Sequence, residues 1–267
     1  MKRVVPPVIL LVLCLSAARA FADTAGLSND PPPPAVQAAS SDLTPQQMAA
    51  HDFDPWEPLN RKVFWFNDHL DMYVIEPAAK GWNFVLPKRV QTSVSNFFAN
   101  LRFPIDTVNN LLQGKVQHAA TDVGRFVVNT TVGAAGFFDP ATSLGLPPHV
   151  EDFGQTLGVW GVRPGPYLVL PILGPSTLRD GAGILVDYPI SITPFFVDWY
   201  YLFAARTVEV VNLRASFLDN LRQAKEASLD YYSFVRNAYL QQRASAVGDQ
   251  APMSKEKAKD LYHPEED

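Results

Sequence analysis

The densest group of side chains capable of acid–base chemistry is His149, Glu151 and Asp152, which fall within four consecutive positions. A histidine beside two carboxylates can move protons in a hydrolase, so catalysis is one interpretation of this cluster. Two acids at the start of a helix also complement the positive end of its dipole, and acids are common there. We favour this second interpretation, which predicts a helix that begins at the cluster.

Other motifs that carry chemistry do not occur in the sequence. The remaining histidines are scattered, and neither His-Glu-x-x-His nor Gly-x-Ser-x-Gly is present. The phosphate-binding pattern Gly-x-x-x-x-Gly-Lys-Ser/Thr does not occur, and Gly181-Ala182-Gly183 lacks the third glycine of a dinucleotide motif. We therefore expect no catalytic residue, no cofactor and no metal site, and hence a protein that is not an enzyme.

Residues 1–22 have the features of an export signal. Lys2 and Arg3 precede the apolar run 8–15, and positions 18–20 and 20–22 have the small-x-small form of a cleavage site. Removing this segment takes away Lys2, Arg3 and Arg19 and no acid, so the formal charge falls from -5 to -8. We do not expect so negative a chain to bind nucleic acid, whose phosphates require a basic face.

The only cysteine, Cys14, lies inside the export signal and has two possible fates. Cleavage at either alanine site would leave the mature chain without cysteine, and hence without disulfides. Cys14 could instead become the acylated first residue of a lipoprotein, but Leu13 stands where that processing requires a small residue. We favour ordinary cleavage, and lipidation of Cys14 stays the alternative.

Composition divides the rest of the chain into three parts. Residues 23–51 include four consecutive prolines and many Ala and Ser residues, which is typical of an unpacked spacer. Residues 245–267 are highly charged, which predicts a flexible, solvated tail. The folded domain is then 52–244. Only 18% of the chain is charged and 12% is aromatic. Two interpretations of this composition stay open: a large, well-filled core, or a surface that contacts something other than water.

Hydrophobic periodicity predicts a mainly α-helical domain, with 167–170 as the best candidate strand. Helices are predicted over 59–70, 87–104, 108–114, 115–132, 207–223 and 227–243. No segment after the export signal holds the roughly 20 apolar residues that a membrane-spanning helix needs. The amphipathic helices could form a bundle core or lie at a membrane surface, and for any single helix we favour the core.

Seven blocks of sequence resemble the MlaA/VacJ family, in the order expected for that family. They are DPWEPLNR at 54–61, SNFFANL at 95–101, RFVVNTTVG at 125–133, GFFDPA at 136–141, EDFGQTLG at 151–158, YLVLPILGPS at 167–176, and the segment 230–240. The resemblance covers about 52–243, and chance agreement of so many long blocks is implausible.

This resemblance implies a ring of largely amphipathic helices in the inner, periplasm-facing leaflet of a Gram-negative outer membrane, with a central channel and very little β-structure. It implies a passive conduit that removes phospholipid misplaced in the outer leaflet and hands it to a soluble periplasmic carrier protein. A complex with a trimeric outer-membrane porin is also implied. Family members are commonly lipoproteins, and the residue before Cys14 departs from that pattern.

Three sets of residues are candidate parts of such a channel. A polar-aromatic stretch before Pro104 predicts a hinge beside the channel or, equally, a packed helix end: Asn96, Phe97, Phe98 and Leu101. Ten of the 15 glycines lie between 133 and 183, and those predicted to allow close packing at the channel wall are Gly133, Gly136, Gly154, Gly158 and Gly161. The tryptophans are candidates for the headgroup boundary or for the core: Trp56, Trp65, Trp82, Trp160 and Trp199.

Two other functions stay open on the sequence alone. A soluble periplasmic lipid carrier would use the apolar helix faces to enclose a cavity. An envelope hydrolase would depend on His149 and Asp152 for its activity.

Overall fold

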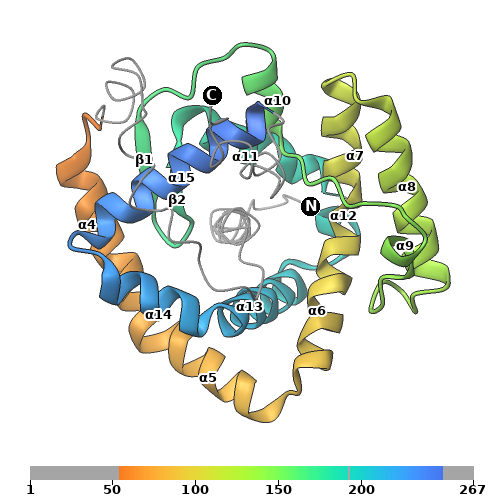
Figure 1. Cartoon of the computed structure of the whole chain (residues 1–267), viewed down its shortest axis with the longest axis horizontal. Helices are drawn as coiled ribbons and strands as arrows, with labels where there is room; N and C mark the ends of the chain where they lie inside the picture. Colours follow the sequence, from red (N-terminus) through yellow and green to blue (C-terminus); the bar gives the residue numbers. More distant parts are fainter. Residues whose placement is uncertain (1–53, 192, 249–267) are drawn as a thin grey trace, which may run out of the picture.

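The helices of this protein are arranged in a ring, as the computed structural model of residues 54–191 and 193–248 shows (Figure 1). The first arc is one continuous run: α4 (Glu57–Leu70), the π-helix η2 (Asp71–Ile75) and α5 (Glu76–Val85). Pro77 has no N–H to donate to the preceding turn. The wider π turn comes just before it, and there the Glu76 N–H donates to the carbonyl of Asp71.

The next side of the ring is α6 (Lys88–Leu101), which follows a turn at Pro87 and packs against α13 (Trp199–Ser216). The chain then turns at Arg102 into a pair of packed helices, α7 (Phe103–Leu112) and α8 (Val116–Thr131). The rings of Phe103 and Phe126 stack between these two helices, with centroids 3.7 Å apart. The short helix α9 (Pro140–Ser143) packs against α8 and begins at Asp139, whose carboxylate accepts a hydrogen bond from the Thr142 N–H.

The last part of the chain closes the ring. It contains α10 (Phe153–Val159), the strands β1 (Tyr167–Leu170) and β2 (Gly174–Thr177), α11 (Leu178–Ile190), α12 (Thr193–Phe196), α13 (Trp199–Ser216), α14 (Leu218–Ala227) and α15 (Tyr231–Val247). The two strands are antiparallel, and Tyr167 lies opposite Thr177. α10 packs across α11 and α15, while α13 packs against α5 and α6, so the last described helices contact the first ones (Figure 1).

The predicted fold class, mainly α with very little β, is confirmed for the part of the chain that the structure describes. The predicted strand matches β1, and three predicted helices match α4, α6 and α8 closely, whereas the helix predicted over 108–114 covers only the second half of α7. None of the helices in residues 54–191 and 193–248 combines the length and apolar character needed to cross a membrane.

Two further predicted helices are wrong at their boundaries. The single helix predicted over 207–223 joins the end of α13 to α14, whereas the chain breaks at Phe217, where φ is −110°. The last helix begins at Tyr231 rather than 227, because Asp230 caps it by accepting a hydrogen bond from the Ser233 N–H. The helices α5 and α11 were not predicted, and α11 contains two glycines and Pro189, which mask a helical pattern.

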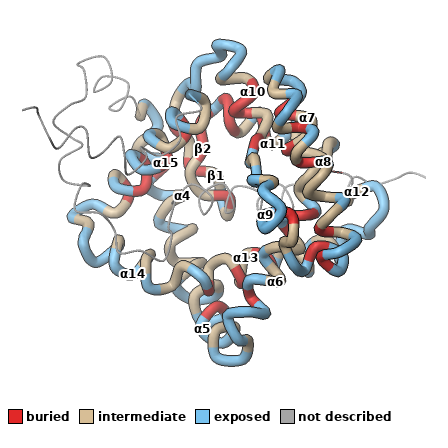
Figure 2. Tube along the Cα trace, turned by 45° about the vertical axis from the view of Figure 1, so that its right-hand side comes forward, coloured by how far each residue is buried: buried red, intermediate tan, exposed pale blue. Residues whose placement is uncertain are grey.

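The side chains packed between the helices are largely polar. Within the described residues, the largest fully buried side chains are Tyr167, Asn60, Asn109, Asn110, Thr156, Thr177 and Ser176. Large apolar side chains are exposed instead on most helices, including Phe84 of α5 at 92% and Phe196 of α12 at 81%. Figure 2 shows the buried residues as short segments within α7, α10, α11 and β2. This distribution is the one expected of a protein whose surface contacts lipid.

Candidate functional site

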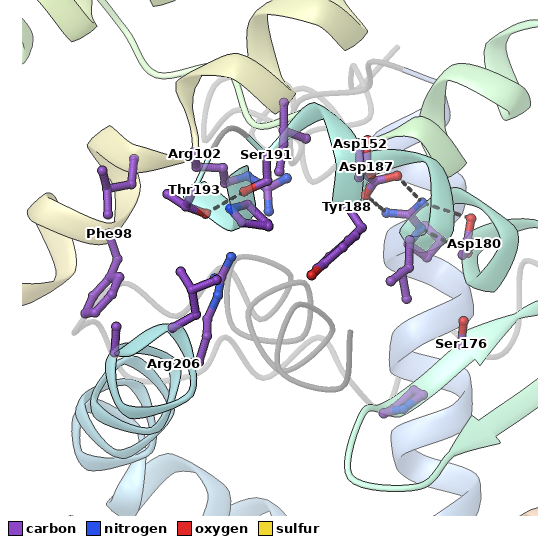
Figure 3. A pocket seen from close by; sticks show the side chains of 18 of the residues that line it. Phe98, Arg102, Asp152, Ser176, Asp180, Asp187, Tyr188, Ser191, Thr193 and Arg206 are labelled. Carbon is purple, nitrogen blue, oxygen red and sulfur yellow. Dashed lines mark hydrogen bonds and ion pairs between the residues drawn. The ribbon is translucent and has the colours of Figure 1, made fainter. Parts of the chain in front are cut away.

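The ring contains a central pocket whose lining comes from elements far apart in the sequence (Figure 3). Residues of α6, α7, β2, α11, α12, α13 and α15 all contribute to it. Its cavity volume is about 120 Å³, well above the roughly 10–15 Å³ that one water molecule requires. The pocket is therefore wide enough to be hydrated.

This central pocket has both apolar and polar lining. Phe98 and Leu101 of α6 present apolar surface, whereas Tyr188, Ser191 and Arg206 present hydroxyl and guanidinium groups. Figure 3 shows the Tyr188 side chain pointing into the space between these groups. A lining of this kind can accept the polar group and the apolar part of the same molecule.

One wall of the pocket is held by a buried ion-pair network centred on Arg243 of α15. Its Nη1 lies 2.6 Å from an oxygen of Asp152, and its Nη2 lies 2.9 Å from an oxygen of Asp180 on α11. The Tyr239 hydroxyl donates to the other oxygen of Asp180 at 2.8 Å. Burial acts to raise the pKa of Asp152, but the Arg243 guanidinium outweighs it and holds that pKa well below its usual range. The network therefore connects α10, α11 and α15 through side chains that stay charged.

Asp187 of α11 lies in the same wall but has no cationic partner in direct contact among the described residues. Its two oxygens accept hydrogen bonds from the Asn109 amide at 2.9 Å and from the Phe153 N–H at 3.0 Å. Burial, together with the negative charge of Asp152, raises the pKa of Asp187 to about 6. Asp187 is thus the carboxylate of this wall that changes charge in mildly acidic solution.

His149, Glu151 and Asp152 make separate side-chain contacts. The Nδ1 of His149 lies 3.3 Å from an oxygen of Asp122, and the Glu151 carboxylate accepts from Lys115 at 2.9 Å. Asp152 caps α10 by accepting from the Gln155 N–H, so the predicted helix start is confirmed. The predicted dipole role is wrong for Glu151, because that residue precedes the first turn and pairs with Lys115.

A second, polar pocket lies between α6, α7 and α8, with a cavity volume of about 260 Å³. Asp122 faces it, and burial raises the pKa of this carboxyl group to about 6 although Asn110 donates a hydrogen bond to it. The His149 ring stacks on His118 with centroids 3.9 Å apart. No group of three potential metal-ligand side chains gathers here or elsewhere in the described residues.

The four candidate hinge residues form the last turns of α6. Phe98 and Leu101 line the central pocket. Asn96 and Phe97 contact the loop after α8 instead, since the Asn96 amide donates to the carbonyl of Phe137 at 3.4 Å and the Phe97 ring stacks on that of Phe137. The segment is continuous helix up to the turn at Arg102, and its role as a hinge stays a prediction.

The candidate glycines differ in their backbone conformation and in how closely other atoms approach them. A Cβ on Gly133 would lie 2.4 Å from the carbonyl oxygen of Phe138, and one on Gly154 or Gly158 would meet side chains of α11 and α15 within 3 Å. Gly136 has a φ of +91° and approaches Asn100 closely. Gly161 has a φ of +88° with no heavy atom within 4 Å, so a turn rather than close packing accounts for it.

Four of the candidate tryptophans are exposed, and one is not. Trp56, Trp65, Trp160 and Trp199 expose large parts of their side chains. Trp82 is partly buried, and its indole donates a hydrogen bond to Asn212 of α13 at 2.9 Å. Trp82 is therefore a contact between α5 and α13, while placement of the other four at a headgroup boundary stays a prediction.

Sequence reasoning missed the polar residues of the central pocket, among them Asp187, Arg206 and Arg243. Asp187 lies between Val186 and Tyr188, and Arg206 follows an apolar stretch at 203–205. A charged residue in that setting is an available signal for a polar interior, whereas the neighbours of Arg243 are largely polar and give no such signal. The ion-pair partners of these residues cannot be found from the sequence in this way. Arg243, for example, is 63 residues from Asp180 and 91 residues from Asp152.

A helical ring that buries polar side chains, exposes apolar ones and contains an amphipathic pocket defines a class of protein suited to a lipid environment. A family model described as MlaA lipoprotein matches residues 52–246. The chain belongs to this family, which confirms the resemblance of the sequence blocks.

Similar proteins support this assignment. The chain is 36% identical to the intermembrane phospholipid transport system lipoprotein MlaA of Haemophilus influenzae, over 73% of the chain and 80% of that protein. It is 37% identical to the Escherichia coli K12 protein of the same name, over 70% and 76%. A solved structure from work on the structural basis for maintenance of bacterial outer membrane lipid asymmetry matches with a TM-score of 0.65 and 34% identity, over 73% of this chain and 98% of that one.

Proposed function

We propose that this protein is a passive conduit for phospholipid in the bacterial outer membrane and takes part in the transport that maintains lipid asymmetry. The observation that carries the proposal is the central pocket, which combines apolar and polar lining inside a ring with exposed apolar side chains. The names of the Haemophilus influenzae and Escherichia coli relatives support phospholipid as the transported molecule.

The physics of lipid movement explains why such a ring is useful. A phospholipid that crosses a leaflet unaided carries a charged headgroup through hydrocarbon, where each unsatisfied polar group costs several kcal/mol. The hydroxyl and charged groups of the pocket offer hydrogen-bond partners that hydrocarbon lacks. Phe98 and Leu101 offer apolar contact for the rest of the molecule. Movement down a concentration gradient through such a pocket requires no hydrolysis of ATP.

The placement that fits this function is the inner, periplasm-facing leaflet of the outer membrane, with the exposed apolar side chains in contact with acyl chains. In this arrangement the protein removes mislocalised phospholipid from the outer leaflet and passes it to a soluble periplasmic carrier. The proposed partner is a trimeric porin, which holds the ring in the inner leaflet, opposite the outer leaflet.

Within the chain, residues 52–244 form the conduit, and the segments 1–22, 23–51 and 245–267 serve as export signal, spacer and tail, with α15 extending into the last of these as far as Val247. Cys14 lies outside the described residues, and its acylation stays the alternative to ordinary cleavage.

The segment that contains Asn96, Phe97, Phe98 and Leu101 is the proposed hinge beside the conduit. Deleting Asn96 and Phe97 would rotate the rest of α6 by about 200°, at 100° per residue, and move Phe98 and Leu101 off the pocket. Unchanged surface phospholipid in cells with this deletion would remove the hinge assignment.

The proposal is tested by measuring phospholipid exposed at the cell surface in cells that lack the protein. We expect more surface phospholipid without the protein, and a return to the normal amount when the full chain is restored. An unchanged amount would contradict the conduit. Fractionation without detergent separates this function from that of a soluble periplasmic carrier, because a carrier stays in the supernatant whereas the exposed apolar side chains predict the membrane pellet.

A further inference from the structure

Three arginines line the central pocket, and they differ in how fully their donors are used. Arg243 is buried between Asp152 and Asp180, and its guanidinium makes four hydrogen bonds to these two carboxylates, counting Nε and both Nη atoms. Arg102 donates from Nε to Asp106 at 2.9 Å and from Nη2 to the carbonyl of Glu151 at 2.9 Å. Both of these arginines are held by the protein.

Arg206 of α13 differs from the other two. Its Nη1 donates to Glu209 at 2.7 Å, and its Nε and Nη2 donate to no other residue of the described chain. The Arg206 side chain is 24% exposed, whereas the Glu209 side chain is 8% exposed. Glu209 therefore fixes one edge of the guanidinium, and the other edge faces the pocket that Arg206 lines.

Two hydroxyl groups lie on the side of the pocket toward which Arg206 points (Figure 3). Ser191, at the end of α11, and Thr193, the first residue of α12, place their hydroxyl oxygens 3.0 Å apart. One of these hydroxyls donates to the other, so the second proton is left for a ligand. A guanidinium edge together with hydroxyl donors is a set that binds phosphate oxygens well.

We propose that Arg206, Ser191 and Thr193 form a site for the phosphodiester of a glycerophospholipid inside the central pocket. This inference rests on the proposed conduit function and specifies what the conduit recognises. The apolar side chains of Leu202 and Phe98 line the same pocket and accept the glycerol and first acyl carbons. Because the shared phosphodiester is recognised, lipids with different headgroups bind alike.

The pairing of Arg206 with Glu209 suits a site through which lipid passes. The two side chains together carry no net charge, so the phosphate meets a dipole and free donors rather than an isolated cation. A transport site must bind well enough to be entered and weakly enough to be left. Full neutralisation of the phosphate by an unpaired arginine would hold the lipid in the pocket.

The test compares lipid binding to the purified full-length chain in detergent, measured by native mass spectrometry. The probes are phosphatidylglycerol, phosphatidylethanolamine and a diacylglycerol with the same acyl chains but no phosphate. We expect the two phospholipids to bind alike and at least about tenfold better than diacylglycerol. In Arg206→Gln this preference should disappear, whereas Arg206→Lys should keep part of it, and Arg222→Gln on the exposed surface of α14 is the matched control that keeps all of it. An Arg206→Gln protein that prefers phospholipids as the wild type does would overturn the proposal.

Two further measurements test the remaining explanations, which are an effect of the changed charge of Glu209 and a site for free phosphate. Arg206→Gln removes the ion pair between Arg206 and Glu209. The double variant Arg206→Gln/Glu209→Gln therefore removes both charges, and in that folded double variant we expect the same loss of preference. Inorganic phosphate at millimolar concentration should leave phosphatidylglycerol bound; if it displaces the lipid, the site is one for free phosphate and the lipid assignment is wrong. Surface phospholipid in cells that lack the protein tests the conduit itself, so a failed site and a failed conduit give different results.

Discussion

The two sides of the central pocket are built in different ways. On one side, α10, α11 and α15 are joined by the buried ion pairs of Arg243 and by direct backbone contact at glycines. On the other side, the four-residue helix α12 and the start of α13 contribute hydroxyls and Arg206, which has one carboxylate partner. The comparison suggests that the first wall holds the ring in shape and that the second leaves donors available to a ligand.

Removing Arg243 should have the largest effect on stability. Arg243→Met leaves Asp152 without a directly paired cation and leaves Asp180 with Arg179 alone, and breaking a buried pair in this way costs about 3–5 kcal/mol. Chemical unfolding of the protein in detergent measures this loss. Arg222→Met, on the exposed surface of α14, is the control and should stay within about 0.5 kcal/mol of the wild type. Equal stability of the two variants would remove the distinction between the walls.

Separating α10 from α11 should have a smaller effect. A Cβ at Gly183 would lie 2.4 Å from the backbone nitrogen of Gly154, so Gly183→Ala forces the two helices apart and should destabilise the fold by about 1–3 kcal/mol. Thermal unfolding of the purified chain checks this value. A Gly183→Ala protein as stable as the wild type would show that the contact is not needed.

The pH dependence of the first wall follows from Asp187. Burial raises the pKa of Asp187 from 3.8 to about 6, so the folded state binds this proton more tightly than the unfolded state does. The stabilisation is complete below about pH 4 and is lost as the pH rises through 6. Because the side chain is not fully buried, we expect the free energy of unfolding of the wild type to fall by about 1–2 kcal/mol relative to Asp187→Asn between pH 4 and 7. A difference that is constant over this range contradicts the assignment.

The smallest effect is expected at a glycine outside both walls. Gly81 lies within α5 with no heavy atom within 4 Å of the position of a Cβ. Gly81→Ala should therefore stabilise the fold by about 0.5–1 kcal/mol through helix propensity, opposite in sign to Gly183→Ala. A loss of stability in this variant would show that the glycine contacts of α10 and α11 are not special.

The same contrast explains what could be predicted from the sequence. The helices α4, α6 and α8 have regular apolar faces, so periodicity locates them well. The pocket walls depend on pairs such as Arg243 with Asp152, whose attraction depends on a fold that periodicity does not describe. The contact of Gly154 with Gly183 was equally out of reach, because a glycine in sequence does not indicate which backbone it approaches.

We propose an arrangement in which the polar interior of the ring is wet while its exposed apolar side chains lie in lipid. It is tested by the reactivity of single introduced cysteines with a water-soluble maleimide in isolated outer membranes, with the chain that lacks the introduced cysteine as control. Tyr188→Cys, in the pocket, should be labelled, whereas Phe84→Cys should be protected although Phe84 is 92% exposed in the protein alone. Labelling at position 84 together with protection at 188 would contradict the account.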